Sequence, residues 1–165
     1  MNVMLDLENG CPEQPGVPDE AAFSLWLDTA LSAIASAQTD KPFQVGIRIV
    51  PEDESARLNH HYRHKDKATN VLSFRPELPV AVLDMLEETP LGDLAICAAV
   101  VQREAQEQGK PEQAHWAHMT LHGLLHLLGY DHEDAQEADE MEALERKILA
   151  SLGIADPYES ERLAV

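Results

Sequence analysis

Residues 115–132 read His115-Trp-Ala-His118-Met-Thr-Leu-His122-Gly-Leu-Leu-His126-Leu-Leu-Gly129-Tyr-Asp-His132. Three of these histidines, at positions 118, 122 and 126, are spaced by four residues and therefore share one face of a helix. The other helical positions are nearly all apolar. The stretch predicts a mostly buried helix over about residues 111–128, which begins at Pro111 and ends at Gly129.

A histidine face on a buried helix is costly unless each imidazole has a polar partner, and a metal ion supplies one. His118 and His126 are about 12 Å apart along the axis, whereas zinc ligands lie only about 2 Å from the ion. A straight helix can therefore supply two ligands one turn apart. We take these to be His122 and His126, because Gly129 lets the chain turn back and present His132. Three nitrogens with a fourth position open to water describe a catalytic zinc site.

Two alternatives bear on this interpretation. The helix could be a core helix whose polar face meets solvent. We expect His118 to pack or to support a ligand, and His115 to be a surface or structural residue. The H-x-x-x-H spacing is that of the zincin proteases, but Gly123 occupies the position of their general-base glutamate. Peptidase activity is therefore the second candidate function for this zincin-like helix.

The rest of the chain predicts one α+β domain over residues 1–165. Alternating or short apolar runs predict four strands, at residues 3–7, 45–49, 71–74 and 94–97. Helical spacing and end signals predict about five helices, at residues 18–34, 51–62, 98–108, 111–128 and 134–152. Asp134 and Glu137 resemble a capping box, and the acids on the outer face of the last helix predict a solvated surface. Residues 75–91, which contain three prolines, predict an irregular connection. We expect a small mixed sheet packed with these helices.

The charge is strongly acidic and unevenly distributed. Twelve Lys and Arg oppose thirty Asp and Glu, for a net charge of -18. Such a surface repels nucleic acid as a whole. Between Arg57 and Arg75, however, five basic residues accompany the single acid Asp66, so this segment carries +4. It is either a solvated basic loop or a local site for an anion.

The composition also suggests a compartment. The two cysteines are Cys11 and Cys97, and Cys97 lies in an apolar segment typical of a buried small hydrophobe. The longest apolar run, residues 94–101, is too short to cross a bilayer. The first residues lack the basic and apolar regions of a signal peptide. We therefore expect a soluble cytoplasmic protein without a membrane partner.

The segment from His122 to His132 resembles the signature of the YbeY family of bacterial endoribonucleases and rRNA maturation factors. Further matches to this family lie at residues 58–59, 62–63, 65–66, 69–74, 92–97, 104–111 and 156–158. The resemblance runs from about residue 45 to 158. Three positions depart from the family pattern: His64 replaces a usual glycine, Ala68 replaces a usual proline, and Arg75-Pro76 follow Ser-Phe where proline would come directly.

This resemblance implies a zinc-dependent, single-strand-specific endoribonuclease that acts in maturation of the 16S rRNA 3′ end and in ribosome quality control. It implies one zinc ion on His122, His126 and His132. The implied partners are precursor rRNA, the small ribosomal subunit, a small-subunit ribosomal protein and an assembly GTPase, with no DNA. The functionally important arginine of the family maps onto Arg63.

Together these observations suggest a mechanism. Zinc could activate a bound water as the nucleophile or act as a Lewis acid on a phosphoryl oxygen, and the sequence leaves open whether water or the neighbouring 2′-hydroxyl attacks. Arg63 would contact the charge that develops on the phosphate. Lys65 and Lys67 would hold the flanking phosphates. Asp131 could orient a ligand or the water, or could be a plain turn residue, whereas we expect a structural role for Asp93.

Two rival functions remain open. One is another zinc hydrolase, such as a peptidase. The other is a non-catalytic ribosome assembly factor whose metal only holds the fold. A structural zinc site has four protein ligands, so the number of protein ligands distinguishes these possibilities.

Overall fold

The sheet grows from a parallel strand pair joined by a helix. In the computed structural model, which describes residues 3–34 and 41–158, β1 (Val3–Asn9) runs parallel to β2 (Phe43–Val50). The strand β4 (Thr89–Cys97) extends the parallel sheet beside β2, and β3 (Val71–Phe74) runs antiparallel to β4. The order is β1-β2-β4-β3. The predicted four-stranded mixed sheet is confirmed.

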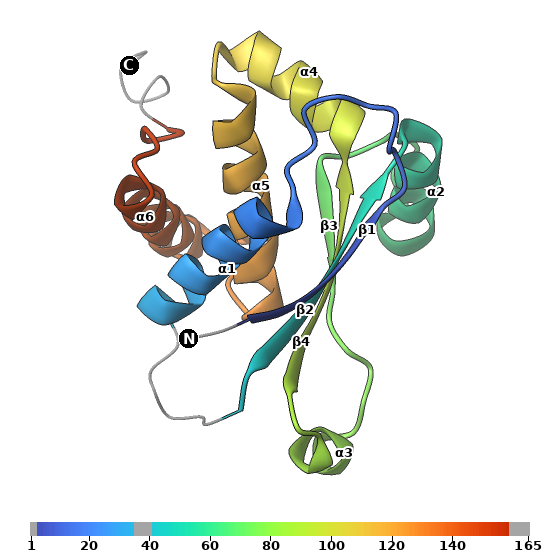
Figure 1. The fold of residues 1–165 in the computed structure, drawn as a ribbon, viewed down its shortest axis with the longest axis vertical. Coiled ribbons are helices and arrows are strands. Elements are labelled where there is room, and N and C mark those ends of the chain that lie inside the picture. Colours follow the sequence, from blue (N-terminus) through green and yellow to red (C-terminus); the bar gives the residue numbers. More distant parts are fainter. Residues whose placement is uncertain (1–2, 35–40, 159–165) are drawn as a thin grey trace.

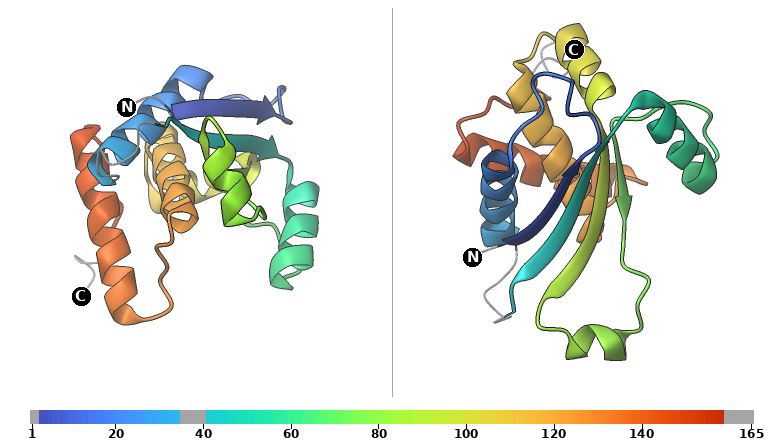
Figure 2. Two further views of the ribbon diagram at one scale, coloured as in Figure 1. Left: turned by 90° about the horizontal axis from the view of Figure 1, so that it is seen from below. Right: turned by 45° about the vertical axis from the view of Figure 1, so that its right-hand side comes forward.

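Helices cover the two faces of the sheet unequally. The helices α1 (Glu20–Ile34) and α5 (Glu112–Leu127) pack on one face, and α6 (Ala135–Ser151) packs against both of them. The helix α2 (Glu52–Arg63) lies on the opposite face against β4, and α4 (Ala98–Gln108) follows β4 without a loop (Figure 1). Figure 2 shows α2 separated from the layer of α1, α5 and α6 by the sheet. The α+β class is confirmed.

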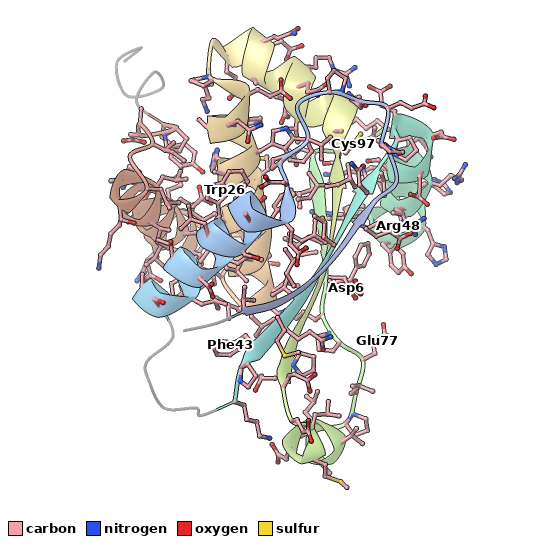
Figure 3. All side chains as sticks on the ribbon, viewed as in Figure 1. Asp6, Trp26, Phe43, Arg48, Glu77 and Cys97 are labelled. Atoms are coloured by element: carbon pink, nitrogen blue, oxygen red, sulfur yellow. The ribbon has the colours of Figure 1, made fainter. Side chains whose placement is uncertain are left out.

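The side chains on the two faces differ in character. Phe23 of α1 contacts Trp116 of α5 edge to face, with 6.1 Å between ring centroids, and Trp26 lies in the same layer (Figure 3). On the opposite face, Arg48 of β2 points toward α2 and pairs with Glu54 at 2.9 Å. The larger apolar core therefore lies between the sheet and the layer that contains α5, and a smaller buried cluster includes Leu72, Ala95 and Cys97.

A glycine sets the position of α5 on the sheet. A Cβ atom at Gly123 would lie 2.8 Å from Leu94 Cδ2 and 3.0 Å from Val71 Cγ2, so the helix backbone approaches β3 and β4 closely. Ser73 of β3 also donates a hydrogen bond from its hydroxyl to the Gly123 carbonyl oxygen, at 3.0 Å. These contacts hold α5 against the sheet and leave His122 and His126 partly exposed.

The helix α2 ends in a left-handed residue. His64 has φ 59° and ψ 33°, and its N–H donates to the His60 carbonyl oxygen at 3.0 Å. The next N–H, of Lys65, donates to the Asn59 carbonyl oxygen at 3.3 Å. This closure favours glycine, because a side chain makes the left-handed conformation costly. The usual glycine of the family pattern thus has a conformational reason.

Some element boundaries differ from those predicted. The segment predicted as irregular contains a short helix, α3 (Val80–Met85), whose Val80 and Met85 side chains are 73% and 84% exposed. Because no face of α3 is buried, its sequence does not show the helical spacing of apolar residues from which a helix is predicted. The strand β4 begins at Thr89 rather than at residue 94, because pairing with β2 continues through a register shift near Val45. No helix in the described part of the chain has the length and apolar character needed to span a membrane.

Candidate functional site

Three imidazoles meet where α5 ends. His122 and His126 extend from the last turns of α5, and His132 follows on the connection to α6. Gly129 makes this turn possible because it has no Cβ and adopts φ +100° without strain, and its N–H donates to the His126 carbonyl oxygen at 3.1 Å. One nitrogen of each ring lies within 4.8 Å of the others. The structure therefore brings together the three predicted ligands, although their atoms belong to a helix and a loop.

The donor set fits a single metal ion. The Nε2 atoms of His122 and His126 are 3.2 Å apart, close to the edge of about 3.3 Å expected for two nitrogens in a tetrahedron around zinc. Burial, followed by the proximity of His122 and His132, lowers the pKa of His126. The His126 ring is therefore neutral at pH 7, the form that binds a metal.

A buried carboxylate lies behind these rings. Glu145 of α6 is 0% exposed and accepts a hydrogen bond at Oε1 from His122 Nδ1, at 2.7 Å. Its Oε2 accepts from His118 Nε2 at 2.9 Å and from the Tyr158 hydroxyl. Burial raises the pKa of Glu145, but the hydrogen bonds from the two histidines outweigh it and lower the pKa to about 2. Glu145 is thus an anion held entirely by protein donors.

His118 forms a hydrogen bond with Glu145 and is not part of the group formed by His122, His126 and His132. Burial lowers its pKa, and the hydrogen bond to Glu145 opposes this shift only in part. His118, His122 and Glu145 also place donor atoms within 4.8 Å of one another. Two of these separations are the hydrogen bonds at 2.7 and 2.9 Å. This arrangement agrees with the expectation that His118 supports a ligand.

His115 is a structural residue rather than a surface residue. Its side chain is 2% exposed, and its Nε2 lies 2.9 Å from Glu104 Oε1. Asn70 also donates to Glu104, at 3.1 and 3.2 Å. Although burial raises it, the pKa of Glu104 is lowered by its hydrogen bonds with His115 and Asn70. This cluster ties α4 and α5 to the start of β3.

A cavity of about 710 Å³ opens in front of the three rings. Its lining includes His122, His126 and His132, together with the cations Arg63 and Arg75. Such a space accommodates several groups of a polymer substrate and places two guanidinium groups near the imidazoles.

Of the three basic residues predicted to bind substrate, only one lines the cavity. Arg63, at the end of α2, lines the cavity. Lys65 and Lys67 are exposed, yet neither lines it. They lie on the short connection between Arg63 and Thr69, both of which do line it. The two lysines are therefore close in sequence to the cavity lining without being part of it.

Asp131 acts on the backbone of the site. Its Oδ1 accepts a hydrogen bond from the His132 N–H at 2.7 Å, which lowers the pKa of this exposed carboxyl. Asp131 therefore makes the contact expected of a turn residue, and this contact holds the backbone of His132. Asp93 does not line the cavity in front of the three rings; it lines a neighbouring one of about 450 Å³, which shares Tyr62, Phe74, Arg75 and Glu77 with the first.

Two residues at the site are not identified by the sequence patterns. Glu145 belongs to the last helix, whose acids are expected to be solvated, although it lies four residues after Met141 and four before Leu149, on the buried stripe. That spacing is the signal that could have found it. Arg75 stands out as the last residue of the basic segment and as a departure from the family pattern, but nothing in its sequence context indicates that its side chain reaches α5.

Gly123 weakens the peptidase alternative. The position after the first histidine faces Leu94 and Val71 in the core, where a glutamate has no room. The zincin general base cannot be supplied from this position.

Comparison with known proteins agrees with this geometry. The family model described as "Endoribonuclease YbeY" matches residues 12–153. A protein of Alkalilimnicola ehrlichii named Endoribonuclease YbeY is 58% identical over 143 residues, which cover 87% of this chain and 83% of the relative. The solution structure of TM1509 from Thermotoga maritima has a TM-score of 0.55 at 21% identity, over 90% of this chain and 91% of that one, so the two share a fold. The chain therefore belongs to the YbeY family of endoribonucleases.

Proposed function

We propose that this endoribonuclease cleaves single-stranded precursor rRNA near the 3′ end of 16S rRNA, in the cytoplasm, with one zinc ion held by His122, His126 and His132. The whole chain, residues 1–165, would act as a single catalytic domain. The observation that carries the proposal is the convergence of three imidazole nitrogens, within 4.8 Å of one another, on a cavity that two arginines also line.

When bound, zinc supplies Lewis acidity and lowers the pKa of coordinated water toward 7. The chain supplies the remaining interactions. His122, His126 and His132 would hold the ion through uncharged ring nitrogens, so its positive charge would remain available to an anionic substrate. Arg63 and Arg75 offer planar donor groups that match the oxygens of a phosphodiester. Lys65 and Lys67 would bind the flanking phosphates.

The charge distribution explains how an acidic enzyme accepts RNA. With a net charge of -18, most of the surface repels a polyanion, so non-specific binding is weak. Arg63 and Arg75 provide local attraction at the cavity, whose lining also contains the acids Glu77 and Asp131. RNA affinity should therefore depend on a few cations and fall as salt screens them.

The number of protein ligands favours an enzyme over a structural metal. In the described part of the chain, the group at the cavity consists of three histidines, whereas a structural zinc site has four protein donors.

We propose that the enzyme acts in ribosome quality control with the small ribosomal subunit, one of its proteins and an assembly GTPase. The family name supports RNA as the substrate, and the ribosomal partners are those that the resemblance of the sequence implies.

The test is cleavage of a 16S rRNA 3′-end transcript by zinc-loaded protein, with a peptide substrate in parallel. Protein stripped with a chelator should be inactive and should regain activity with zinc. The His126→Ala variant, purified in the same way, controls for contaminating ribonuclease. Equal cleavage by this variant, or cleavage of the peptide alone, would refute the proposed function.

A further inference from the structure

We propose that Glu145 is the positioning residue that fixes the tautomer and ring orientation of His122, and that His118 and Tyr158 hold Glu145 for this role. The inference rests on the proposed function, because it takes His122 to be a metal ligand. It assigns to the metal site two residues of the C-terminal part of the chain, on α6 and just beyond it.

The burial of Glu145 is unusual for this chain. Among residues 3–34 and 41–158, it is the only carboxylate-bearing residue that is buried. A buried anion destabilises a fold unless donors compensate its lost hydration. The neighbouring positions on the same stripe, Met141, Ile148 and Leu149, are apolar and also buried. An apolar residue at position 145 would suit the packing, so packing alone does not account for the carboxylate.

The contact with His122 determines where its ring proton lies. An ionised carboxylate can only accept hydrogen bonds. At a separation of 2.7 Å, Nδ1 of His122 must therefore carry the proton and donate it to Glu145 Oε1. The lone pair of the ring is then on Nε2, which lies 3.2 Å from Nε2 of His126. A histidine ligand oriented by a carboxylate in this way is also a stronger base toward a metal.

The second oxygen of Glu145 keeps the carboxylate from rotating. Oε2 accepts from His118 Nε2 at 2.9 Å and from the Tyr158 hydroxyl. His118 Nδ1 is buried without a hydrogen-bond partner, which agrees with a neutral ring whose proton is on Nε2. Tyr158 is itself placed by its N–H, which donates to Asp156 Oδ1 at 2.8 Å. Donors from α5 and from the segment after α6 thus fix both ends of the carboxylate.

The other two ring ligands have no equivalent support. Two carboxylates are adjacent in sequence to His132, Asp131 and Glu133; Asp131 accepts from the His132 backbone rather than from its ring. Within the same set of residues, no hydrogen bond joins a carboxylate to a ring nitrogen of His126 or His132, whereas His122 has one. Glu145 should therefore influence metal affinity through His122 alone.

The test compares zinc affinity, measured by competition with a chromophoric chelator, for Glu145→Gln and for Glu140→Gln. Glu140 lies on the same helix but is exposed, so its variant removes a charge without touching the site. We expect Glu145→Gln to bind zinc about 10- to 100-fold more weakly and Glu140→Gln to match the unchanged protein. Affinity of Glu145→Gln within twofold of the unchanged protein would overturn the inference.

A second measurement does not depend on whether the variant folds. Nitrogen-15 NMR of the zinc-free, unsubstituted protein reports which ring nitrogen of each histidine carries a proton. His122 should be protonated at Nδ1, and protonation at Nε2 would overturn the inference.

The Tyr158→Phe variant, which removes one hydroxyl, should weaken zinc binding by a smaller factor. A purely structural role of Tyr158 would lower thermal stability and leave zinc affinity unchanged.

These results can be separated from those for the proposed function. If the unchanged protein binds zinc and Glu145→Gln binds it weakly, the role of Glu145 stands even if RNA is not cleaved. If RNA is cleaved and both proteins bind zinc equally, the proposed function stands and the role of Glu145 fails.

Discussion

The guanidinium of Arg75 donates from Nε and Nη2 to the main-chain oxygen of His126, at 3.3 and 3.0 Å. This contact joins the end of β3 to the last turn of α5, where carbonyl groups lack partners within the helix. It also places a cation beside a metal-ligating position, in the lining of the cavity. Arg75 therefore stabilises the end of the helix and faces the space proposed for RNA.

We predict that Arg75→Gln raises the KM for RNA by about 10-fold, because a charge-assisted hydrogen bond to phosphate is lost. Zinc content should not change. Arg57→Gln is the matched control, since Arg57 is exposed, pairs with Asp53, and is absent from the lining of this cavity among the described residues. An unchanged KM in Arg75→Gln would show that this guanidinium only caps α5.

Arg63→Glu should retain zinc and lose cleavage by on the order of 100-fold, because a preorganised positive charge is replaced by a negative one. Elemental analysis measures the zinc, and a single-turnover assay measures the rate. Lys67→Glu, at an exposed position outside the cavity lining, should have a smaller effect that disappears at high salt. Normal cleavage by Arg63→Glu would remove this residue from the proposed mechanism.

His64→Gly should increase the free energy of unfolding by about 1 kcal/mol, because glycine adopts the left-handed conformation without the cost that a side chain carries. Urea denaturation checks this value. In contrast, His61→Gly lies within the helix and should destabilise the protein. A loss of stability in His64→Gly would indicate that the imidazole makes a compensating contact.

The pH dependence of stability should reveal Glu104. Its pKa is lower in the folded protein than the ordinary value of 4.5, so it stabilises the fold above that pH and loses this contribution as the pH falls. Glu104→Gln should therefore cost about 1 kcal/mol at pH 7, and the difference should shrink below pH 4.5. Glu107→Gln, on the exposed side of the same helix, should show no such trend.

The features that the sequence predicts best are those in which the spacing of residues sets the geometry. The i, i+4 spacing of His122 and His126, followed by the turn at Gly129, is enough to predict that these rings and that of His132 converge. The buried core of α5 is equally predictable, because its apolar positions surround the helix. These features depend on local geometry, which the order of residues determines.

The features that the sequence does not predict depend on tertiary contacts. Glu145 resembles the other acids of α6 in sequence, and its role follows from the packing of α6 against α5. The side chain of Arg75 reaches His126 across 51 positions of the chain. The early start of β4 depends on its pairing with β2. Local patterns do not encode such contacts.

The three histidines His122, His126 and His132 are proposed to bind one metal ion together, and the rest of the mechanism depends on this site. The most direct measurement is a crystal structure of fully zinc-loaded protein, with an anomalous difference map recorded at the zinc absorption edge. We predict one peak about 2.0 Å from a nitrogen of each of the three rings, with no fourth protein ligand. A peak elsewhere, or rings that remain apart around empty space in zinc-loaded crystals, would contradict the proposed metal site.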